Sequence, residues 1–588
     1  MKFKMRNKQH MSLSVDDGRA VALEKLIEKE IPSEKSSVPQ HTRPMPRIYF
    51  IGVDVGTTSA RAALVTSQGE VINQHSEKIT IWNPEKDHYE QSSDNIWNSI
   101  CECVRTVTAD VPKDEIVAIS FDATCSLVVL GEYGQPLSVS TTSSPDQNVI
   151  LWMDHRASEE TDKINSTKHE ILRCVGGQVS LEMQMPKLLW LKNHMYITTW
   201  SKIWRTFDLP DFLTWRATGF ASRSLCSVVC KWNFDAERNQ WCSDFLEQIG
   251  LDDLCDNNFE IIGREILKPG DPVGRGLSER AANELSLNKG IFVGASLIDA
   301  HAGALGMFGC KTGVYDLDAM EGKLALICGT STCHMSLTKS PCWAEGVWGP
   351  YKNAILPNYY LNEAGQSAAG VLLDHVVMTH PRFKDVCTLL DENEHIYSYL
   401  NKVLHQMAVD KNLEDVCLLT KDIHMWPDFH GNRSPLSDPG LRGMICGLQL
   451  KSDEEELAIL YLATMQALAY GTKHIIETLM EKQRPKYHSL LFCGGLAKND
   501  LYVQTHADVC ELPAVVPYEQ EMVLVGAAIL GACASKVYPS LECASQAMGG
   551  KGKILYPEGC TIDFHRKKYR VFLNMLSDQR KYCDIMNS

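Results

Sequence analysis

Residues 48–66 read IYFIGVDVGTTSARAALVT, and this stretch decides the fold class. Its apolar part, IYFIGVDV, predicts a buried strand, GTTSA predicts a tight polar turn, and RAALVT predicts a second strand. Beyond it, segments with helical periodicity alternate with short apolar strands such as EIVAISFD, GIFVGASLID and SLLFCGG. This alternation favours an α/β fold over an all-β or an all-helical one.

A second strand–turn–strand unit, LALICGTSTCHMSL, lies at residues 324–337 and repeats the pattern of the first. One unit in each half of the chain predicts an internal duplication, with two lobes and a cleft between them. Glycines gather in GMFGCKTGV at residues 306–314, where we expect the boundary between the lobes. The sequence therefore predicts a first lobe at 47–308 and a second lobe at 309–588. A mobile tail at 1–46, rich in Lys, Ser, Pro and Gln, precedes them.

The composition is that of an ordinary globular protein, because 44% of the 588 residues are hydrophobic and 22% are charged. Lys and Arg total 58 against 73 Asp and Glu, and the resulting net charge of −15 disfavours nucleic acid as a partner. The longest apolar run, residues 522–534, is too short to cross a bilayer, so no membrane association is expected.

The 21 cysteines are scattered along the chain, and the closest pair, Cys101 and Cys103, has neither zinc-ribbon nor redox spacing. We expect reduced thiols in a cytoplasmic protein and no cluster of histidines and cysteines that would hold zinc. Assembly into a homodimer is left open.

The two turns between the predicted strands are candidate phosphate sites. Backbone N–H groups in a turn rich in Gly, Thr and Ser can hold phosphate oxygens, and the hydroxyls add donors. No lysine follows the glycines as a Walker loop would require. Each turn alone is as well explained as an ordinary hairpin turn, but two at corresponding places favour phosphate binding. The candidate residues are Gly56, Thr57, Thr58 and Ser59 in the first turn, and Gly329, Thr330 and Ser331 in the second.

Two aspartates end apolar strands beside small-residue segments. A carboxylate at the position of Asp54 needs water, a donor or a metal ion, and a hydrated Mg²⁺ that bridges ATP phosphates is a natural partner. Asp299, in VGASLIDAHAGALG, is the candidate general base. The plainer alternative for either aspartate is N-capping of the following helix.

The segment LFCGGLAKN, residues 491–499, runs from a strand into a double glycine and a helix start. Gly494 and Gly495 would let a flat ligand approach the backbone, although a tight turn explains them equally well. The small-residue segment VLVGAAILGA at 523–532 then predicts either an adenosine floor or plain core.

With these motifs in order, residues from about 47 to the C-terminus resemble the FGGY carbohydrate kinases, of the sugar kinase, hsp70 and actin superfamily. The resemblance rests on FIGVDVGTTSARAAL, WMDHRA, DLPDFLTWRATG, GASLIDAHAGALG, ICGTSTCHM, WPDFHGNRSPLSDPGLRG, ATMQALAYGTKHIIETL and FCGGLAKN. It implies two RNase H-like lobes of the actin-like ATPase type around a catalytic cleft. It also implies ATP and Mg²⁺ as cofactors and a small sugar as substrate, with Asn499 on the adenine side.

Three further segments resemble the D-ribulokinase type within that family: FDATCSLV at 121–128, SLCSVVCKWNF at 224–234 and LNEAGQSAAG at 361–370. By this resemblance Ala123 and Thr124 border the sugar, Lys231 and Glu363 hydrogen-bond to it, and Asp299 takes the proton of the attacking hydroxyl. The implied activity is ATP-dependent phosphorylation of the terminal hydroxyl of a pentulose, D-ribulose foremost. Ribitol, L-ribulose and xylulose remain open as substrates, as does a catalytically silent ATP-binding clamp. Glycerol kinases carry an Arg-Glu pair in place of Ala123 and Thr124, which argues against glycerol.

The chain departs from the family pattern at two places. Ala364 stands where a glycine is usual, and Asp500 stands where a proline is usual. If residue 364 had a positive φ, alanine there would cost of order 1 kcal/mol and could change the pocket.

Overall fold

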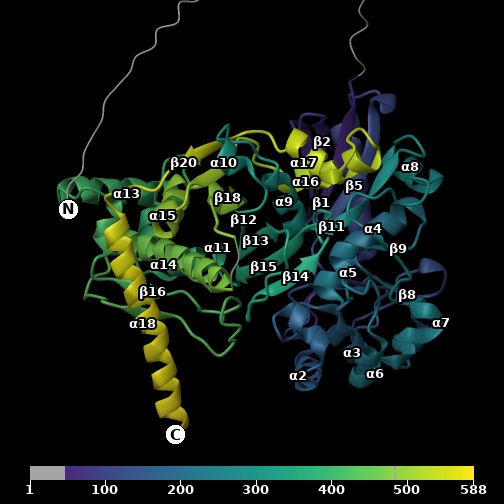
Figure 1. Cartoon of the computed structure of the whole chain (residues 1–588), viewed down its shortest axis with the longest axis horizontal. Coiled ribbons are helices and arrows are strands. Elements are labelled where there is room, and N and C mark those ends of the chain that lie inside the picture. The colour runs from purple at the N-terminus through teal and green to yellow at the C-terminus, as the bar shows by residue number, and fades with distance from the viewer. Residues whose placement is uncertain (1–46, 483–484) are drawn as a thin grey trace, which may run out of the picture. The chain divides into compact units, whose positions relative to one another are not determined.

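The computed structural model describes residues 47–482 and 485–588, and the predicted tail at 1–46 lies outside the described residues. The first half of the chain forms a five-stranded sheet with the order β11-β5-β1-β2-β3 (Figure 1). Within it, β1 runs antiparallel to β2 and parallel to β5, and β5 runs parallel to β11. The bounds are β1 Tyr49–Val55, β2 Ser59–Thr66, β3 Val71–Lys78, β5 Ile116–Ala123 and β11 Phe292–Ile298.

The second half forms a seven-stranded sheet with the order β14-β15-β13-β12-β18-β19-β20. Its central strands repeat the first sheet: β12 runs antiparallel to β13 and parallel to β18, β18 runs parallel to β19, and β13 runs antiparallel to β15. The predicted α/β fold and its internal duplication are therefore confirmed by the strand order. The bounds are β12 Lys323–Cys328, β13 Thr332–Thr338, β14 Trp348–Lys352, β15 Tyr360–Gln366, β18 Ser489–Cys493, β19 Ala514–Pro517 and β20 Gly552–Leu555.

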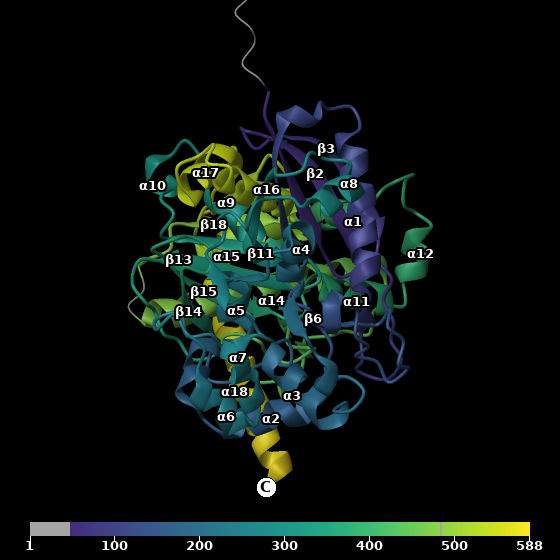
Figure 2. The same ribbon diagram turned by 90° about the vertical axis from the view of Figure 1, so that its right-hand side faces the viewer.

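Helix α1, Ser93–Thr108, packs along β2 and β3 (Figure 2). It begins after Ser92, whose hydroxyl accepts a hydrogen bond from the backbone N–H of Asn95 at 3.2 Å. Its apolar residues recur at helical spacing, so that Ile96, Ile100 and Val104 are all buried against the sheet.

Two small-residue helices connect the sheets. Helix α9, Asp299–Phe308, follows β11, and helix α16, Met522–Ala534, comes from the far end of the chain yet packs on α9, β1 and β5 (Figure 1). A Cβ placed on Gly526 would lie 1.9 Å from the carbonyl oxygen of Ala302, and one on Gly52 would lie 2.1 Å from that of Leu524. The glycines are needed because backbones touch there. These contacts place residues 523–532 in the core, as the plainer of the two alternatives for this segment holds.

The remaining elements are short strands and further helices. Short strands form a four-stranded sheet, β4 Glu90–Gln91, β7 Val149–Ile150, β6 Leu127–Leu130 and β8 Arg205–Asp208, and two pairs, β9 Ser222–Ser224 with β10 Glu265–Leu267 and β16 His424–Trp426 with β17 Met444–Cys446. The other helices are α2 Ser158–Ser166, α3 Gln184–His194, α4 Leu209–Thr218, α5 Leu225–Lys231, α6 Ser243–Ile249, α7 Asp256–Phe259, α8 Glu279–Leu285, α10 Tyr315–Asp318, α11 Gly370–Thr379, α12 Phe383–Cys387, α13 Ile396–Asp410, α14 Glu454–Glu481, α15 Asp500–Cys510, α17 Leu541–Met548 and α18 Ile562–Asn587. Within residues 47–482 and 485–588, none of these helices has the length and hydrophobicity that crossing a bilayer requires.

Candidate active site

The first predicted phosphate turn connects β1 to β2. The N–H of Gly56 donates to the carbonyl oxygen of Ser59 at 3.0 Å and closes the turn. Two side chains hydrogen-bond to Thr57. Its hydroxyl accepts a hydrogen bond from the Trp152 indole at 3.0 Å, and its carbonyl accepts one from the Gln91 amide at 2.8 Å. Thr58 is left exposed at the tip of the turn. The nearest atom to a Cβ on Gly56 would be 3.8 Å away, so there is room for a ligand in front of this backbone.

The second turn connects β12 to β13 in the same way. The N–H of Gly329 donates to the carbonyl oxygen of Ser331 at 2.9 Å. The start of α11 supports the turn, since Ala369 N–H donates to Thr330 O at 2.9 Å and Gly370 N–H donates to Gly329 O at 3.1 Å. A Cβ on Gly329 would meet nothing closer than 3.9 Å. Both turns thus present an open glycine at the end of a central strand.

Asp54 lies at the end of β1 and is 2% exposed. Its carboxylate accepts a hydrogen bond from Arg61 Nε at 2.8 Å and pairs with a second nitrogen of the same guanidinium. Arg61 also pairs with Glu521 at 2.8 Å, which joins the β1–β2 hairpin to the turn before α16. The donor that the sequence required for this carboxylate is therefore Arg61, seven residues further along the chain.

Asp299 is the first residue of α9 and is partly buried. The N-cap position of this helix is Ile298, so Asp299 is not the N-cap residue, although its carboxylate accepts the first-turn N–H of Ala300 at 2.7 Å. Burial and the nearby negative charge of Asp54 raise the pKa of Asp299 from 3.8 to about 7. A carboxyl group with this pKa is suited to accept a proton near neutral pH.

Asp122 is a third aspartate at this place, and the sequence assigned it no role. It is fully buried and lies in register with Asp54 on the neighbouring parallel strand. Burial and the adjacent Asp54 raise the pKa of Asp122 well above its usual value. Its signal in the sequence is the motif FDATCSLV, in which only the two residues after it were singled out. Pairing of β1 with β5, set by the fold, brings the two carboxyl groups together.

The residues expected to border the sugar, Ala123 and Thr124, lie at the carboxyl end of β5, directly after Asp122. Ala123 closes β5 and is fully buried, and Thr124 follows it. The N–H of Thr124 donates to the carbonyl oxygen of Val55 at 2.9 Å, so this pair lies beside the first turn. The Thr124 hydroxyl is 3.2 Å from that of Ser126.

Lys231 and Glu363 form a buried ion pair that joins the two halves of the chain. Lys231 ends α5, Glu363 lies on β15, and Nζ is 3.6 Å from Oε1 while both side chains are at most 3% exposed. The charge of Lys231 also acts on Asp299 and lowers the pKa of that carboxyl group against the effect of burial. The two residues predicted to hold the sugar are therefore together, and they lie near the candidate base.

Three residues that were not predicted from the sequence, Arg433, Glu182 and Trp348, lie around the Lys231–Glu363 pair. Arg433 Nη2 lies 3.3 Å from Glu363 Oε1 and 3.5 Å from Glu182 Oε2. The Trp348 ring lies beneath both cations, 4.2 Å from Lys231 Nζ and 4.4 Å from Arg433 Cζ. Arg433 belongs to the motif WPDFHGNRSPLSDPGLRG, whose match could have marked it, whereas nothing in the sequence indicates where Trp348 and Glu182 lie.

The double glycine follows β18, and its two residues differ in kind. Gly494 has φ 92°, and a Cβ on it would lie 2.5 Å from the carbonyl oxygen of Cys328. A Cβ on the exposed Gly495 would have no protein atom within 4 Å. The backbone at position 494 therefore requires glycine, which supports the interpretation as a tight turn. Gly495 has open space beside it, which a bound flat ligand would need.

Asn499 caps α15 by accepting the N–H of Tyr502 at 3.4 Å. Its amide donates to the Tyr461 hydroxyl at 2.6 Å, and its carbonyl accepts from the Asn401 amide at 2.9 Å. Asn499, which the resemblance places on the adenine side, thus links α15 to α14 and α13 through hydrogen bonds. Asp500, in place of the usual proline, starts α15 and pairs with Lys553 at 3.0 Å.

Ala364 lies within β15, where it pairs with His334 of β13. Its backbone is that of an extended strand, so alanine is accommodated without the penalty of a positive φ. The departure from the usual glycine therefore adds no strain next to Glu363.

One expectation is wrong. The sequence predicted no cluster of histidines and cysteines, yet Cys226, Cys230 and His301 offer ligand atoms that all lie within 4.8 Å of one another. They are brought together because α5 packs against β11, the strand that leads directly into α9, although Cys230 and His301 are 71 positions apart in the chain. Burial lowers the pKa of His301 to about 4, so its imidazole is neutral.

Comparison with known proteins agrees with this arrangement. Residues 49–306 match the N-terminal domain of the FGGY family of carbohydrate kinases, and residues 324–535 match its C-terminal domain. The chain is 48% identical over 546 residues to the FGGY carbohydrate kinase domain-containing protein of Xenopus laevis, which covers 92% of this chain and 98% of that protein. It is 38% identical over 517 residues to a D-ribulokinase of Saccharomyces cerevisiae, which covers 83% of this chain and 72% of that protein.

Among solved structures, the xylulose kinase of Rhodospirillum rubrum superposes with a TM-score of 0.74 at 17% identity, covering 91% of this chain and 99% of that one. This similarity shows a shared fold, the actin-like ATPase fold of sugar kinases. The two matched domains, the relatives and the paired hairpin turns all agree, and the chain belongs to the FGGY family of carbohydrate kinases.

Proposed function

We propose that this carbohydrate kinase transfers the γ-phosphoryl group of ATP to the terminal hydroxyl of a pentulose, with D-ribulose as the preferred substrate. The observation that carries the proposal is the buried Lys231–Glu363 pair beside Asp299. A positive and a negative group side by side can donate to and accept from the carbonyl and hydroxyl groups of a ketose. The similarity to a yeast D-ribulokinase supports the choice of sugar.

In this proposal the chain's residues position the reactants and bear their charge. Asp299 orients the terminal hydroxyl and accepts its proton, and Lys231 and Glu363 hold the sugar beside it, bordered by Ala123 and Thr124. Phosphoryl transfer depends mainly on this positioning and on charge neutralisation.

The residues present also fit the nucleotide and its metal ion. The open glycine turns at Gly56 and Gly329 suit the β- and γ-phosphates, and the space at Gly495 suits the adenosine. The carboxylate of Asp54 would hold a Mg²⁺ ion through water, and ATP with Mg²⁺ supplies the transferred group and part of the charge neutralisation.

The experiment that tests this function measures ADP release from Mg·ATP with D-ribulose, L-ribulose, D-xylulose, ribitol and glycerol supplied separately. The Asp299→Asn variant serves as the blank. Turnover led by D-ribulose supports the proposal, and turnover led by another sugar reassigns the substrate. Binding of ATP without turnover on any of them would favour the silent clamp.

The double glycine allows a test of the nucleotide side. We expect Gly495→Val to raise the KM for ATP at least tenfold, because the added side chain fills the open space and meets ligand instead of protein. The KM for the sugar and the melting temperature should change little. Gly69→Val is the contrasting control: φ is +85° and a Cβ there would lie 1.8 Å from Met548 O, so that variant should lose stability. An unchanged KM for ATP in Gly495→Val would place the adenosine elsewhere.

The raised pKa of Asp299 predicts a pH dependence. The base must be ionised to accept a proton, so kcat/KM for the sugar should fall as pH decreases through about 7, by about tenfold per unit below that. Initial rates at saturating ATP across about pH 5.5 to about pH 8.5 measure this acidic limb. A flat profile over that range would remove Asp299 as the titrating base.

A further inference from the structure

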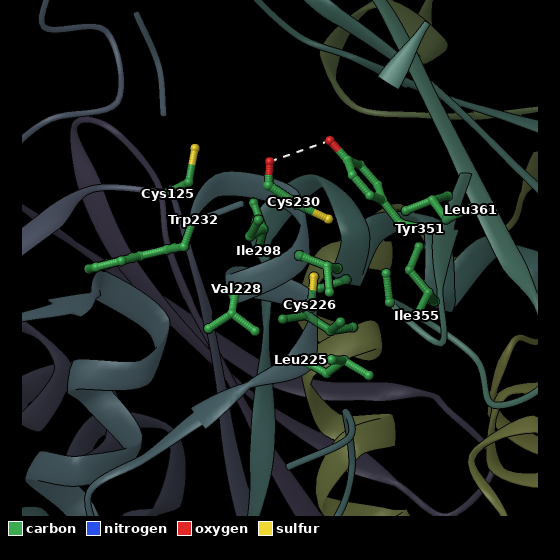
Figure 3. Packing of buried hydrophobic residues seen from close by; sticks show 14 of the residues in the cluster. Cys125, Leu225, Cys226, Val228, Cys230, Trp232, Ile298, Tyr351, Ile355 and Leu361 are labelled. Carbon is green, nitrogen blue, oxygen red and sulfur yellow. Dashed lines mark hydrogen bonds between the residues drawn. The ribbon is translucent and has the colours of Figure 1, made fainter. Parts of the chain in front are cut away.

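Next to the Lys231–Glu363 pair lie two thiols and an imidazole that phosphoryl transfer does not use. Cys226 and Cys230 lie one turn apart on α5, and His301 lies on α9. All three are fully buried. Figure 3 shows the two sulfur atoms close together on α5, with Tyr351 beside Cys230; the Tyr351 hydroxyl donates to the Cys230 carbonyl oxygen at 3.4 Å. Cys226 Sγ, Cys230 Sγ and a ring nitrogen of His301 lie within 4.8 Å of one another.

The distance between one thiol and the imidazole matches a tetrahedral metal site. With Zn–S near 2.3 Å and Zn–N near 2.0–2.1 Å, the sulfur and nitrogen ligands of such a site are about 3.5 Å apart. Cys230 Sγ lies 3.5 Å from His301 Nε2. The thiol and the imidazole are therefore already at the separation that a shared zinc ion would impose.

A carboxylate faces the same nitrogen, although it is not one of the three ligand groups that lie within 4.8 Å of one another. Glu363 Oε2 lies 3.6 Å from His301 Nε2 and has no hydrogen-bond partner among the described residues. The other oxygen, Oε1, is the one near Lys231 and Arg433, at 3.6 Å and 3.3 Å. A buried carboxylate oxygen without a partner is costly, and a cation between Oε2 and His301 would satisfy it.

We propose that Cys226, Cys230 and His301 form a binding site for a thiophilic divalent cation of the Zn²⁺ class, and that Glu363 completes it as fourth ligand when its carboxylate turns toward the ion. Binding would release the two thiol protons to solvent and leave two thiolates, a neutral imidazole and a carboxylate around the ion. The net charge of −1 on that group would lie next to Lys231 and Arg433, which offset it. Mg²⁺ would not compete, because it prefers oxygen ligands in octahedral geometry.

Occupation of this site has a consequence that rests on the proposed function. Glu363 cannot bind the metal and the sugar in the same way at once, so the cation and the pentulose should exclude one another. The site would then make the kinase sensitive to free Zn²⁺, with inhibition that sugar relieves.

The test uses Co²⁺ as the probe on the full chain, reduced with a phosphine and freed of metal by a chelator. One Co²⁺ per chain should give the intense visible bands of tetrahedral cobalt and a thiolate charge-transfer band. Cys226→Ala and Cys230→Ala should each weaken binding at least 100-fold. The exposed Cys543 provides the matched control, and Cys543→Ala should leave the spectrum unchanged.

Weak octahedral bands in the wild-type protein, or a full tetrahedral spectrum in Cys230→Ala, would overturn the site. Should a cysteine variant fail to fold, the wild-type protein still decides the matter, because D-ribulose added beforehand should slow the appearance of the cobalt spectrum. An absence of protection together with an octahedral spectrum contradicts the proposal. If no sugar supports turnover but the tetrahedral spectrum is present, the proposed function fails and the metal site stands.

Discussion

Asp299→Asn is expected to lower kcat for pentulose phosphorylation by about a thousandfold, with KM values for ATP and sugar that stay within about threefold of wild type. The amide keeps the shape of the side chain and the contact with Ala300 N–H at 2.7 Å, but it cannot accept the proton. Steady-state and single-turnover rates would measure the loss. Turnover close to wild type would remove Asp299 from the mechanism.

A stability measurement separates this loss from misfolding. The folded-state pKa of Asp299, about 7, lies above its ordinary 3.8. The unfolded chain therefore binds fewer protons between these two values, and this carboxyl group lowers the free energy of unfolding as pH rises from about 4 to about 7. Asp299→Asn removes that contribution, so the variant should unfold at the same temperature as wild type or higher at pH 8. A markedly lower melting temperature would attribute the lost activity to structure.

Lys231→Met should raise the KM for the pentulose about 100-fold and leave the KM for ATP nearly unchanged. Methionine keeps much of the volume of the side chain but removes the charge that lies 3.6 Å from Glu363 and 4.2 Å above Trp348. Losing one partner of a buried charge pair costs about 2–5 kcal/mol. A 100-fold weaker affinity corresponds to about 2.8 kcal/mol, which lies within that range. Initial rates against sugar concentration, at saturating ATP, provide the measurement.

The control for this variant is Lys352→Met, because Lys352 also forms an ion pair, with Glu237 at 2.8 Å, but its side chain is 36% exposed. Exposed pairs contribute little, so that variant should resemble wild type in both KM values. A defect in Lys231→Met that is confined to ATP would assign Lys231 to the nucleotide side.

Much of the architecture could be predicted from residues 48–66 and their repeat at 324–337. Period-2 apolar patterns and glycine turns are local signals, because a hairpin forms between neighbours in the chain. The same reasoning located Gly56, Gly329 and Gly495, where an added Cβ would meet no protein atom closer than 3.8 Å. It left residues 523–532 undecided, because a small-residue helix has the same sequence whether it packs on a ligand or on α9 and β1.

The sequence by itself determined the strand–turn–strand units, their duplication and the identity of the aspartates at the strand ends, since each depends on a few consecutive residues. Only the tertiary structure decided what these groups meet. Glu363 lies next to Lys231, 132 residues before it, and to Arg433, 70 residues after it, and Cys230 lies next to His301. The tertiary structure also decided the pKa of Asp299, because burial and the charge of Asp54 are properties of the folded surroundings and not of the residue itself.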